Sequence, residues 1–88
     1  MISNIKGIIL HKDPRFIIID TGGVGYKVFT TSDTINNMKS SKEISIWTHL
    51  AVRENALDLY GFLSLEELNF FELLITISGI GPKTALGI

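Results

Sequence analysis

The spacing of apolar residues changes once along this chain of 88 residues, at Ser64. Before Ser64, apolar and β-branched residues form short runs separated by turn-forming residues, which is typical of β-strands. After Ser64, apolar residues recur three and four positions apart, as they do on one face of a helix. The change predicts a β-rich domain over residues 1–63, followed by a helical segment over residues 64–88.

Five runs before Ser64 have the composition of strands, and we expect these strands at residues 2–10, 16–19, 24–29, 43–52 and 57–62. A Gly-Gly pair suits a hairpin turn after the second strand, and Gly25 is a candidate for a β-bulge. The polar stretch 30–42 has room for a short helix capped by Thr31 or Ser32. This arrangement predicts a mainly β fold with C-terminal helices, in which the strands form a five-stranded Greek-key barrel of the OB type. An open two-layer sheet is the competing architecture.

Two helices are expected after the barrel. Ser64 and Glu67 have the spacing of a capping box, in which the hydroxyl and the carboxylate accept hydrogen bonds from main-chain N–H groups of the first turn. The first helix is expected to end in the stretch 78–81, which contains two glycines. Pro82 suits the first position of a second helix, which we expect to continue through the chain end at Ile88.

The residue inventory excludes several classes of site. The chain has no cysteine, so disulfides and thiolate metal sites are excluded. His11 and His49 are its only histidines and make a poor set of metal ligands, so we expect no metal and no other cofactor. No nucleophile-and-base pair or paired carboxylate has a spacing that favours catalysis. The chain is therefore a weak candidate for an enzyme.

The formal net charge of -1 conceals an asymmetry, because residues 1–53 carry +3 and residues 54–88 carry -4. The negative total weighs against nonspecific binding to nucleic acid, since that affinity comes from Lys and Arg at the phosphates. The apolar runs are far shorter than the roughly 18 residues of a membrane span, and no signal peptide is visible. We expect a cytoplasmic protein with no membrane association.

The stretch Gly79-Ile80-Gly81-Pro82-Lys83 is the most informative candidate for a binding site. A helix end, a Gly-x-Gly turn and a helix start bring free main-chain N–H groups together, with a lysine in the first turn. Such a group suits a phosphate, and the glycines allow a ligand to approach the backbone closely. A plain turn between two helices, with glycine as the C-cap, is the alternative.

Further motifs accompany this stretch along essentially the whole chain. They are Met1-Ile2 with Lys6-Gly7, Gly22-Gly23-Val24-Gly25-Tyr26, Thr48-His49, Val52-Arg53-Glu54 and Leu59-Tyr60-Gly61-Phe62. In this order the motifs resemble the N-terminal part of the RuvA family, whose members are the DNA-junction-binding subunits of the bacterial Holliday-junction branch-migration complex. No single motif would be sufficient, but the joint match is highly specific.

The resemblance implies an OB-fold barrel followed by helix-hairpin-helix elements, assembled as a homotetramer that holds four-way junction DNA open for recombination and repair. Residues 64–88 would be the first helix-hairpin-helix of a truncated second domain. The resemblance assigns Gly79, Ile80, Gly81 and Lys83 to the phosphates of the DNA backbone, which carry no base identity. We expect the chain to be non-catalytic and to bind the junction weakly when alone. The ATPase of the family's complex is RuvB, which binds a C-terminal domain absent from this chain.

The resemblance also implies an acidic pin at the turn between the fourth and fifth strands. The matching positions are Glu54 and Asn55, flanked by Arg53. The second position is usually acidic in the family, so the neutral Asn55 halves the expected charge of the pin. Carboxylates there are expected to repel phosphates at the centre of the junction. Arg53 is a candidate phosphate contact, with pairing to Glu54 as the alternative.

Two other functions stay open. A generic OB and helix-hairpin-helix module would bind single strands or duplex DNA, and would need exposed aromatic rings for stacking. The candidates are Phe16, Phe29, Trp47 and Tyr60, of which we expect at least Trp47 to be buried. An oligomerisation scaffold without DNA affinity is the third possibility.

Overall fold

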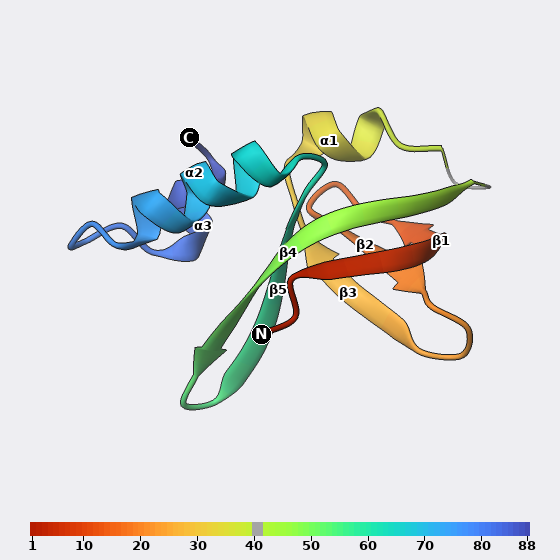
Figure 1. Cartoon of the computed structure of the whole chain (residues 1–88), viewed down its shortest axis with the longest axis horizontal. Helices are drawn as coiled ribbons and strands as arrows, with labels where there is room; N and C mark the ends of the chain where they lie inside the picture. Colours follow the sequence, from red (N-terminus) through yellow and green to blue (C-terminus); the bar gives the residue numbers. More distant parts are fainter. Residues whose placement is uncertain (40–41) are drawn as a thin grey trace.

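Five strands close into a barrel, with three short helices outside it, in the residues that the structure describes (Figure 1). The structure is a computed structural model that describes residues 1–39 and 42–88. The elements in chain order are β1 (Asn4–Lys12), β2 (Phe16–Asp20), β3 (Gly25–Phe29), α1 (Ser32–Asn36), β4 (Glu43–Arg53), β5 (Ala56–Phe62), α2 (Leu65–Ile75) and α3 (Pro82–Leu86). Every predicted strand is confirmed, with ends that differ by at most two residues.

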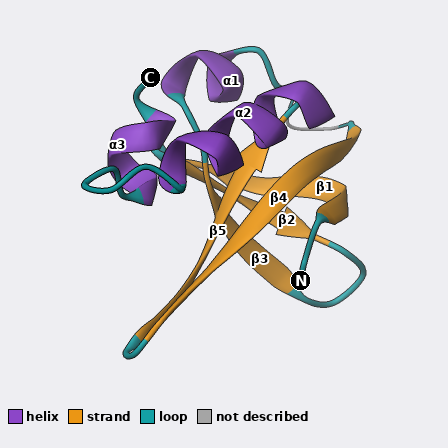
Figure 2. Ribbon diagram, turned by 60° about the vertical axis from the view of Figure 1, so that its left-hand side comes forward, coloured by secondary structure: helices purple, strands orange, loops and turns teal. Residues whose placement is uncertain are grey.

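The strand order around the barrel is β1-β2-β3-β5-β4, and β4 pairs with β1 to close it. Neighbouring strands are antiparallel except β3 and β5, which run parallel where Val28 lies opposite Leu59. This closed arrangement confirms the OB-type barrel and excludes the open two-layer sheet. In Figure 2 the three helices gather at one end of the barrel.

Alternate residues of the strands fill the barrel with β-branched and other aliphatic side chains. The buried members of this first cluster are Ile5, Ile9, Ile17, Ile19, Val28, Ile35, Met38, Ile46 and Leu59. Full burial of one such side chain stabilises the fold by about 1.5–3 kcal/mol. Because Ile35 lies in α1 and Met38 follows it, this helix closes one end of the barrel.

A second cluster joins the outside of β4 and β5 to the C-terminal helices. Its buried members are Ala51, Tyr60, Phe62, Leu68, Phe71 and Ala85. Strands β4 and β5 therefore contribute to both clusters, which places the helices at a fixed position against the barrel. Trp47 packs against the second cluster and is only partly buried, so the prediction that it is a buried core residue holds only in part.

The β-bulge predicted at Gly25 is wrong. Gly25 lies opposite Asp20 in an unbroken register between β2 and β3. The irregularity lies in β1 instead, where the register against β2 shifts between Ile9 and His11. Leu10 is therefore the extra residue, and its side chain is exposed. A bulge re-aims the side chains that follow it, which lets β1 bend around the barrel.

The Ser64 hydroxyl caps α2 as predicted, whereas the Glu67 carboxylate bonds to that hydroxyl and not to the main-chain N–H group expected of a capping box. Its hydroxyl oxygen accepts a hydrogen bond from the Glu67 N–H at 3.2 Å and donates to the Glu67 carboxylate at 3.1 Å. The helix ends at Ile75, a few residues before the predicted stretch 78–81.

The second predicted helix, α3, begins at Pro82 as expected but ends at Leu86. Gly87 is its C-cap, so the prediction that this helix continues through Ile88 is wrong. Glycine is a poor residue for a helix interior, which accounts for the end at this position. None of the helices in the described residues is long and apolar enough to cross a membrane.

Close contact between β1 and β2 makes glycine necessary at position 7. A Cβ added to Gly7 would collide with the main-chain carbonyl of Asp20 and would lie 2.9 Å from Cγ2 of Ile19. Backbone atoms cannot move aside without disturbing the strand pairing.

We therefore expect Gly7→Ala to lower the free energy of unfolding by about 1–3 kcal/mol, the usual cost of overpacking a core. Denaturant unfolding followed by circular dichroism measures this change. The matched control is Gly87→Ala, because a Cβ there meets its nearest atom at 3.5 Å. Equal stability of the two variants would contradict the close contact.

The turn between β2 and β3 is held by a carboxylate. Oδ1 of Asp20 accepts hydrogen bonds from the N–H groups of Gly23 at 2.8 Å and Gly22 at 3.0 Å. Both glycines have positive φ, which glycine adopts without steric cost. The hydrogen bond from Gly23, and next that from Gly22, lowers the pKa of Asp20 below its ordinary value of 3.8.

A lowered pKa in the folded state means that Asp20 stabilises the turn above the pKa of the unfolded chain. This contribution is lost as the pH falls through the folded-state pKa. We expect a 13C NMR titration of the Asp20 carboxyl to give a midpoint below 3.8. A midpoint at or above that value would contradict the two hydrogen bonds.

Candidate nucleic-acid interface

The outer halves of β4 and β5 form a two-stranded arm that projects from the barrel (Figures 1 and 2). The cause lies in the strand pairing. Pairing between β4 and β1 ends where Trp47 lies opposite Asn4, whereas pairing between β4 and β5 continues to Arg53 opposite Ala56. Just beyond Trp47, the edge of β4 meets the stretch before β1, where Thr48 donates hydrogen bonds to the carbonyls of Ser3 and Ile2.

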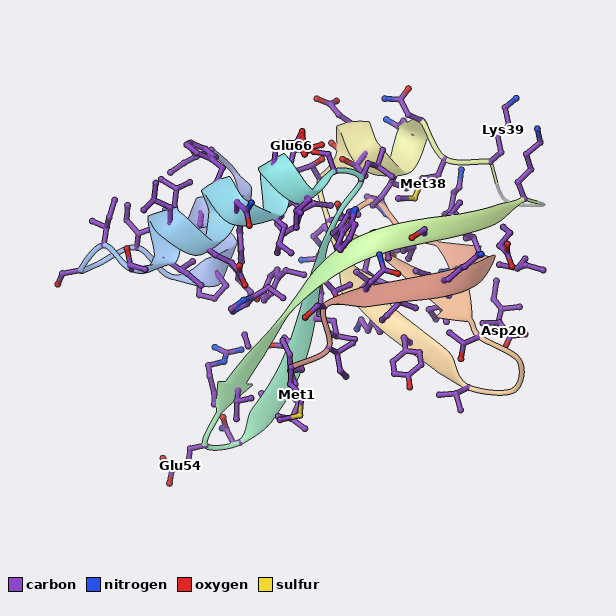
Figure 3. All side chains as sticks on the ribbon, viewed as in Figure 1. Met1, Asp20, Met38, Lys39, Glu54 and Glu66 are labelled. Carbon is purple, nitrogen blue, oxygen red and sulfur yellow. The ribbon has the colours of Figure 1, made fainter. Side chains whose placement is uncertain are left out.

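Glu54 and Asn55 form the tip of this arm, and both are exposed. Figure 3 shows Glu54 at the far end of the arm, with its carboxylate pointing away from the rest of the molecule. The two predicted pin residues are thus placed together at a projecting turn.

Arg53 does not pair with Glu54, which was one of the two alternatives from the sequence. Its guanidinium Nη2 donates instead to Oδ2 of Asp58 at 2.7 Å, across the arm. Arg53 lies opposite Ala56, and Asp58 is two residues further along β5, on the same face as Ala56. The spacing of these residues in the sequence is therefore typical of a cross-strand pair. Asp58 was not singled out because recognising this pair depends on knowing the length of the turn.

The predicted phosphate loop connects α2 to α3. Gly79 has φ +86, and a Cβ on Gly79 or Gly81 would meet no atom within 4 Å. Both glycines are exposed, as is Lys83 in the first turn of α3. The main-chain N–H groups of Gly79, Gly81 and Lys83 donate no hydrogen bond within residues 1–39 and 42–88.

Ile80 differs from its neighbours in this loop. Its N–H already donates to the carbonyl of Ile77 at 3.1 Å, and its side chain packs against the second cluster. The structure thus brings the four predicted residues together, with three free amides around one engaged amide. Ile80 anchors the loop while the other three residues face solvent.

Phe71 fixes α2, and with it the loop, against the barrel. Its ring centroid lies 4.9 Å from that of Phe62, 5.5 Å from that of Tyr60 and 5.6 Å from that of His49. Beside it, Nδ1 of His49 and Oε2 of Glu72 are 2.9 Å apart and join β4 to α2.

Tyr60 connects this aromatic contact with the arm. Burial raises the pKa of its phenol above 10.0, and the negative charge of Asp58 adds to the rise. The positive charge of Arg53 opposes it. The charges of the Arg53–Asp58 ion pair on the arm therefore act on Tyr60, which is a member of the second cluster.

The tip of the arm and the loop between α2 and α3 are not adjacent in this chain. Figure 1 shows them at separate extremities of the molecule, one at the end of β4 and β5 and the other at the far end of α2. They are therefore two separate exposed segments, negative at the tip and rich in N–H donors at the loop, and α2 joins the loop to the hairpin of β4 and β5.

Curated relatives match essentially the whole of this sequence. Proteins named "Holliday junction branch migration complex subunit RuvA" are 45% identical over 89 residues in Acetivibrio thermocellus and 47% identical over 87 residues in Ruminiclostridium cellulolyticum. The protein of the same name from Francisella tularensis subsp. novicida is 45% identical over 91 residues. These matches cover 98–100% of this chain and 41–44% of the relatives. The chain thus spans less than half the length of these relatives.

A match to a protein family agrees with these relatives. Residues 1–61 match the family described as "RuvA N terminal domain". This range holds the whole barrel up to the last residues of β5, together with the projecting arm. Because the match covers well over half of the sequence, the chain belongs to the RuvA N-terminal domain family.

Proposed function

We propose that this chain is the N-terminal, DNA-binding part of a subunit that holds a Holliday junction open during branch migration. The proposal is supported by family membership and by the name that the curated relatives carry. The observation that carries it is the placement of a projecting acidic tip and an open, donor-rich loop on one rigid hairpin and helix assembly.

The loop between α2 and α3 is suited to a phosphate of the DNA backbone. Three free main-chain N–H groups, from Gly79, Gly81 and Lys83, can donate to phosphate oxygens, and the Lys83 ammonium adds a positive charge. Because the two glycines have no Cβ, a DNA strand can come close to the main chain of the loop. Ile80 takes part by holding the loop in place. Contacts of this kind position DNA without reading its bases.

The tip of the arm acts by repulsion. The Glu54 carboxylate projects into solvent without a cation bonded to it within the described residues, so it repels phosphates that approach. Asn55 adds no charge, and each copy of the chain therefore contributes one carboxylate. Arg53 is the candidate phosphate contact on the arm, and its bond to Asp58 holds the guanidinium along the stem.

We extend the proposal to the assembly on the basis of family membership. Four copies would surround the junction, so that four tips meet at its centre and each loop holds one arm of the DNA. Residues 64–88 would begin a second, helical domain, whose further helices cover the exposed outer face of α2 at Phe70 and Leu73. The chain would itself be non-catalytic and cytoplasmic. The ATP-driven motor, RuvB, would bind a part of the longer protein outside this chain.

A generic module for single strands or duplex DNA is the weaker candidate. Such a module needs exposed rings on which bases can stack. Among the four rings considered, Tyr60 is buried and Phe16, Phe29 and Trp47 are partly buried. None of the four is fully exposed, which weakens the case for base stacking on them.

Two substitutions with opposite effects test the proposal. Lys83→Ala removes one phosphate contact and should weaken binding to a four-way junction, with the salt slope reduced by about 0.9 per subunit. Glu54→Gln removes a repelling charge and should strengthen binding about two- to fivefold, with less effect at high salt. Fluorescence anisotropy of a labelled junction at micromolar protein concentrations measures both affinities.

Matched controls remove the same charges elsewhere. Lys6→Ala takes away an exposed lysine on β1, and Glu66→Gln takes away an exposed carboxylate on α2. Both controls should bind as the unmodified chain does. If Lys83→Ala and Glu54→Gln bind no differently from their controls, neither the loop nor the tip is part of the interface.

A further inference from the structure

A cavity of about 480 Å³ lies between the barrel and α3, and three cations line it. They are Arg15 before β2, Lys27 on β3 and Lys83 on α3. None of the three takes part in an ion pair within the described part of the chain. The three unpaired cations make this cavity locally positive, although the chain as a whole is slightly negative.

The aromatic wall of this cavity holds Lys27 in place. Nζ of Lys27 lies 4.3 Å from the ring centroid of Phe16 and 5.2 Å from that of Phe29. The strand register produces this arrangement, since Phe16 lies directly opposite Phe29 and Lys27 is two residues before Phe29 on the same face of β3. Contacts with two rings fix an ammonium that would otherwise be free to move. Lys27 is therefore a positioned cation, with ring surface below it.

Thr30 forms part of the wall of the same cavity and carries a buried hydroxyl group. The residue is only 3% exposed and lines the cavity, and its Oγ1 has no hydrogen-bond partner among the described residues. Its N–H is satisfied, since it donates to the Arg15 carbonyl at 3.1 Å. Buried hydroxyl groups without a partner are uncommon in folded proteins, and each one calls for an explanation. A ligand oxygen in the cavity would satisfy this hydroxyl.

The neighbouring carboxylates do not neutralise the cavity. Asp13 accepts a hydrogen bond from the Arg15 N–H at 3.2 Å, and Asp33 borders an adjacent hollow that also includes Lys83. Neither carboxylate lines the cavity itself. An anion in the cavity would thus meet three cations and a hydroxyl, with no acidic side chain in the wall.

We propose that this cavity binds the phosphate of a nucleotide unit, and that the unit belongs to the DNA strand seated on the loop between α2 and α3. The inference rests on the proposed function, because Lys83 follows that loop directly and lines the cavity. The three cations and the Thr30 hydroxyl would contact the phosphate, while Phe16 and Phe29 provide an apolar wall for the attached sugar. The DNA contact then extends from the helices onto the barrel.

The first test separates binding from folding at Thr30. Thr30→Val keeps the shape of the side chain and removes the hydroxyl. We expect junction affinity to fall several-fold while stability in denaturant stays equal or rises, since an unpartnered hydroxyl no longer has to be buried. Unchanged affinity would overturn the role of the hydroxyl in binding the phosphate.

The second test removes the cations. Arg15→Ala and Lys27→Ala should each lower junction affinity about five- to tenfold at 0.1 M salt and reduce the salt slope by about 0.9. Lys6→Ala, which removes an exposed lysine outside the cavity, should change neither quantity. If the unmodified chain binds the junction and the two cavity variants bind it equally well, the cavity proposal fails and the proposed function stands. If the unmodified chain binds no DNA, both fail.

A free nucleotide is the other source of the same phosphate. Deoxyadenosine monophosphate, titrated into the labelled chain, should move the amide signals of Lys27 and Thr30 weakly and should be displaced by junction DNA. The cavity would instead be a site for a free nucleotide if these signals shift strongly and the Arg15, Lys27 and Thr30 variants bind junction DNA as the unmodified chain does. That result would overturn the proposal that the phosphate belongs to DNA.

Discussion

The pairing of β4 with β5 is the interaction on which the rest of the structure depends. The inner residues Ile46 and Leu59 belong to the barrel core, and β5 closes the barrel through its parallel contact with β3. The outer face of the same pair carries Tyr60 and Phe62, against which Phe71 holds α2. The far end of the pair carries Glu54. One hairpin thus fixes the barrel, the helices and the acidic tip relative to one another.

This arrangement gives the proposed interface a geometry that charge alone would not provide. The chain carries a net charge of -1, so its overall charge does not attract DNA. Donors are concentrated at two places, the free amides beside Lys83 and the cavity around Lys27, while Glu54 stands apart from both at the end of the arm. In the proposed interface, attraction at defined points and repulsion at another would favour DNA of a particular shape over DNA in general.

Strand pattern and turn residues were enough to predict the five strands, because alternation of apolar residues follows directly from burial of one face. They favoured a barrel but left an open two-layer sheet possible, since closure depends on the pairing of β4 with β1. The cap at Ser64 and the start of α3 at Pro82 were predictable for the same local reason. The bulge at Leu10 was not, since it depends on how β1 bends around a closed barrel. The bulge predicted at Gly25 was wrong because glycine occurs in strands for several reasons, and a bulge is only one of them.

The two predicted site segments lie in turns whose residues are mostly exposed, but the side chains that they contact were not predictable. The bond between Arg53 and Asp58 depends on the register across the arm, and the cavity depends on residues from β2, β3 and α3 that lie far apart in the sequence. Tertiary contacts of this kind leave no periodic signal. The end of α3 before Ile88 shows the same limit, since the turn at Gly87 outweighed the helical pattern before it.

The central claim is that this family member recognises the shape of a DNA junction. Competition binding of a four-way junction against a linear duplex with the same arm sequence, repeated over a series of salt concentrations, tests it most directly. The account predicts a junction preference that persists as salt rises, because the preference comes from the placement of the contacts. Equal affinities that fall together with salt would show a generic phosphate binder and contradict the account.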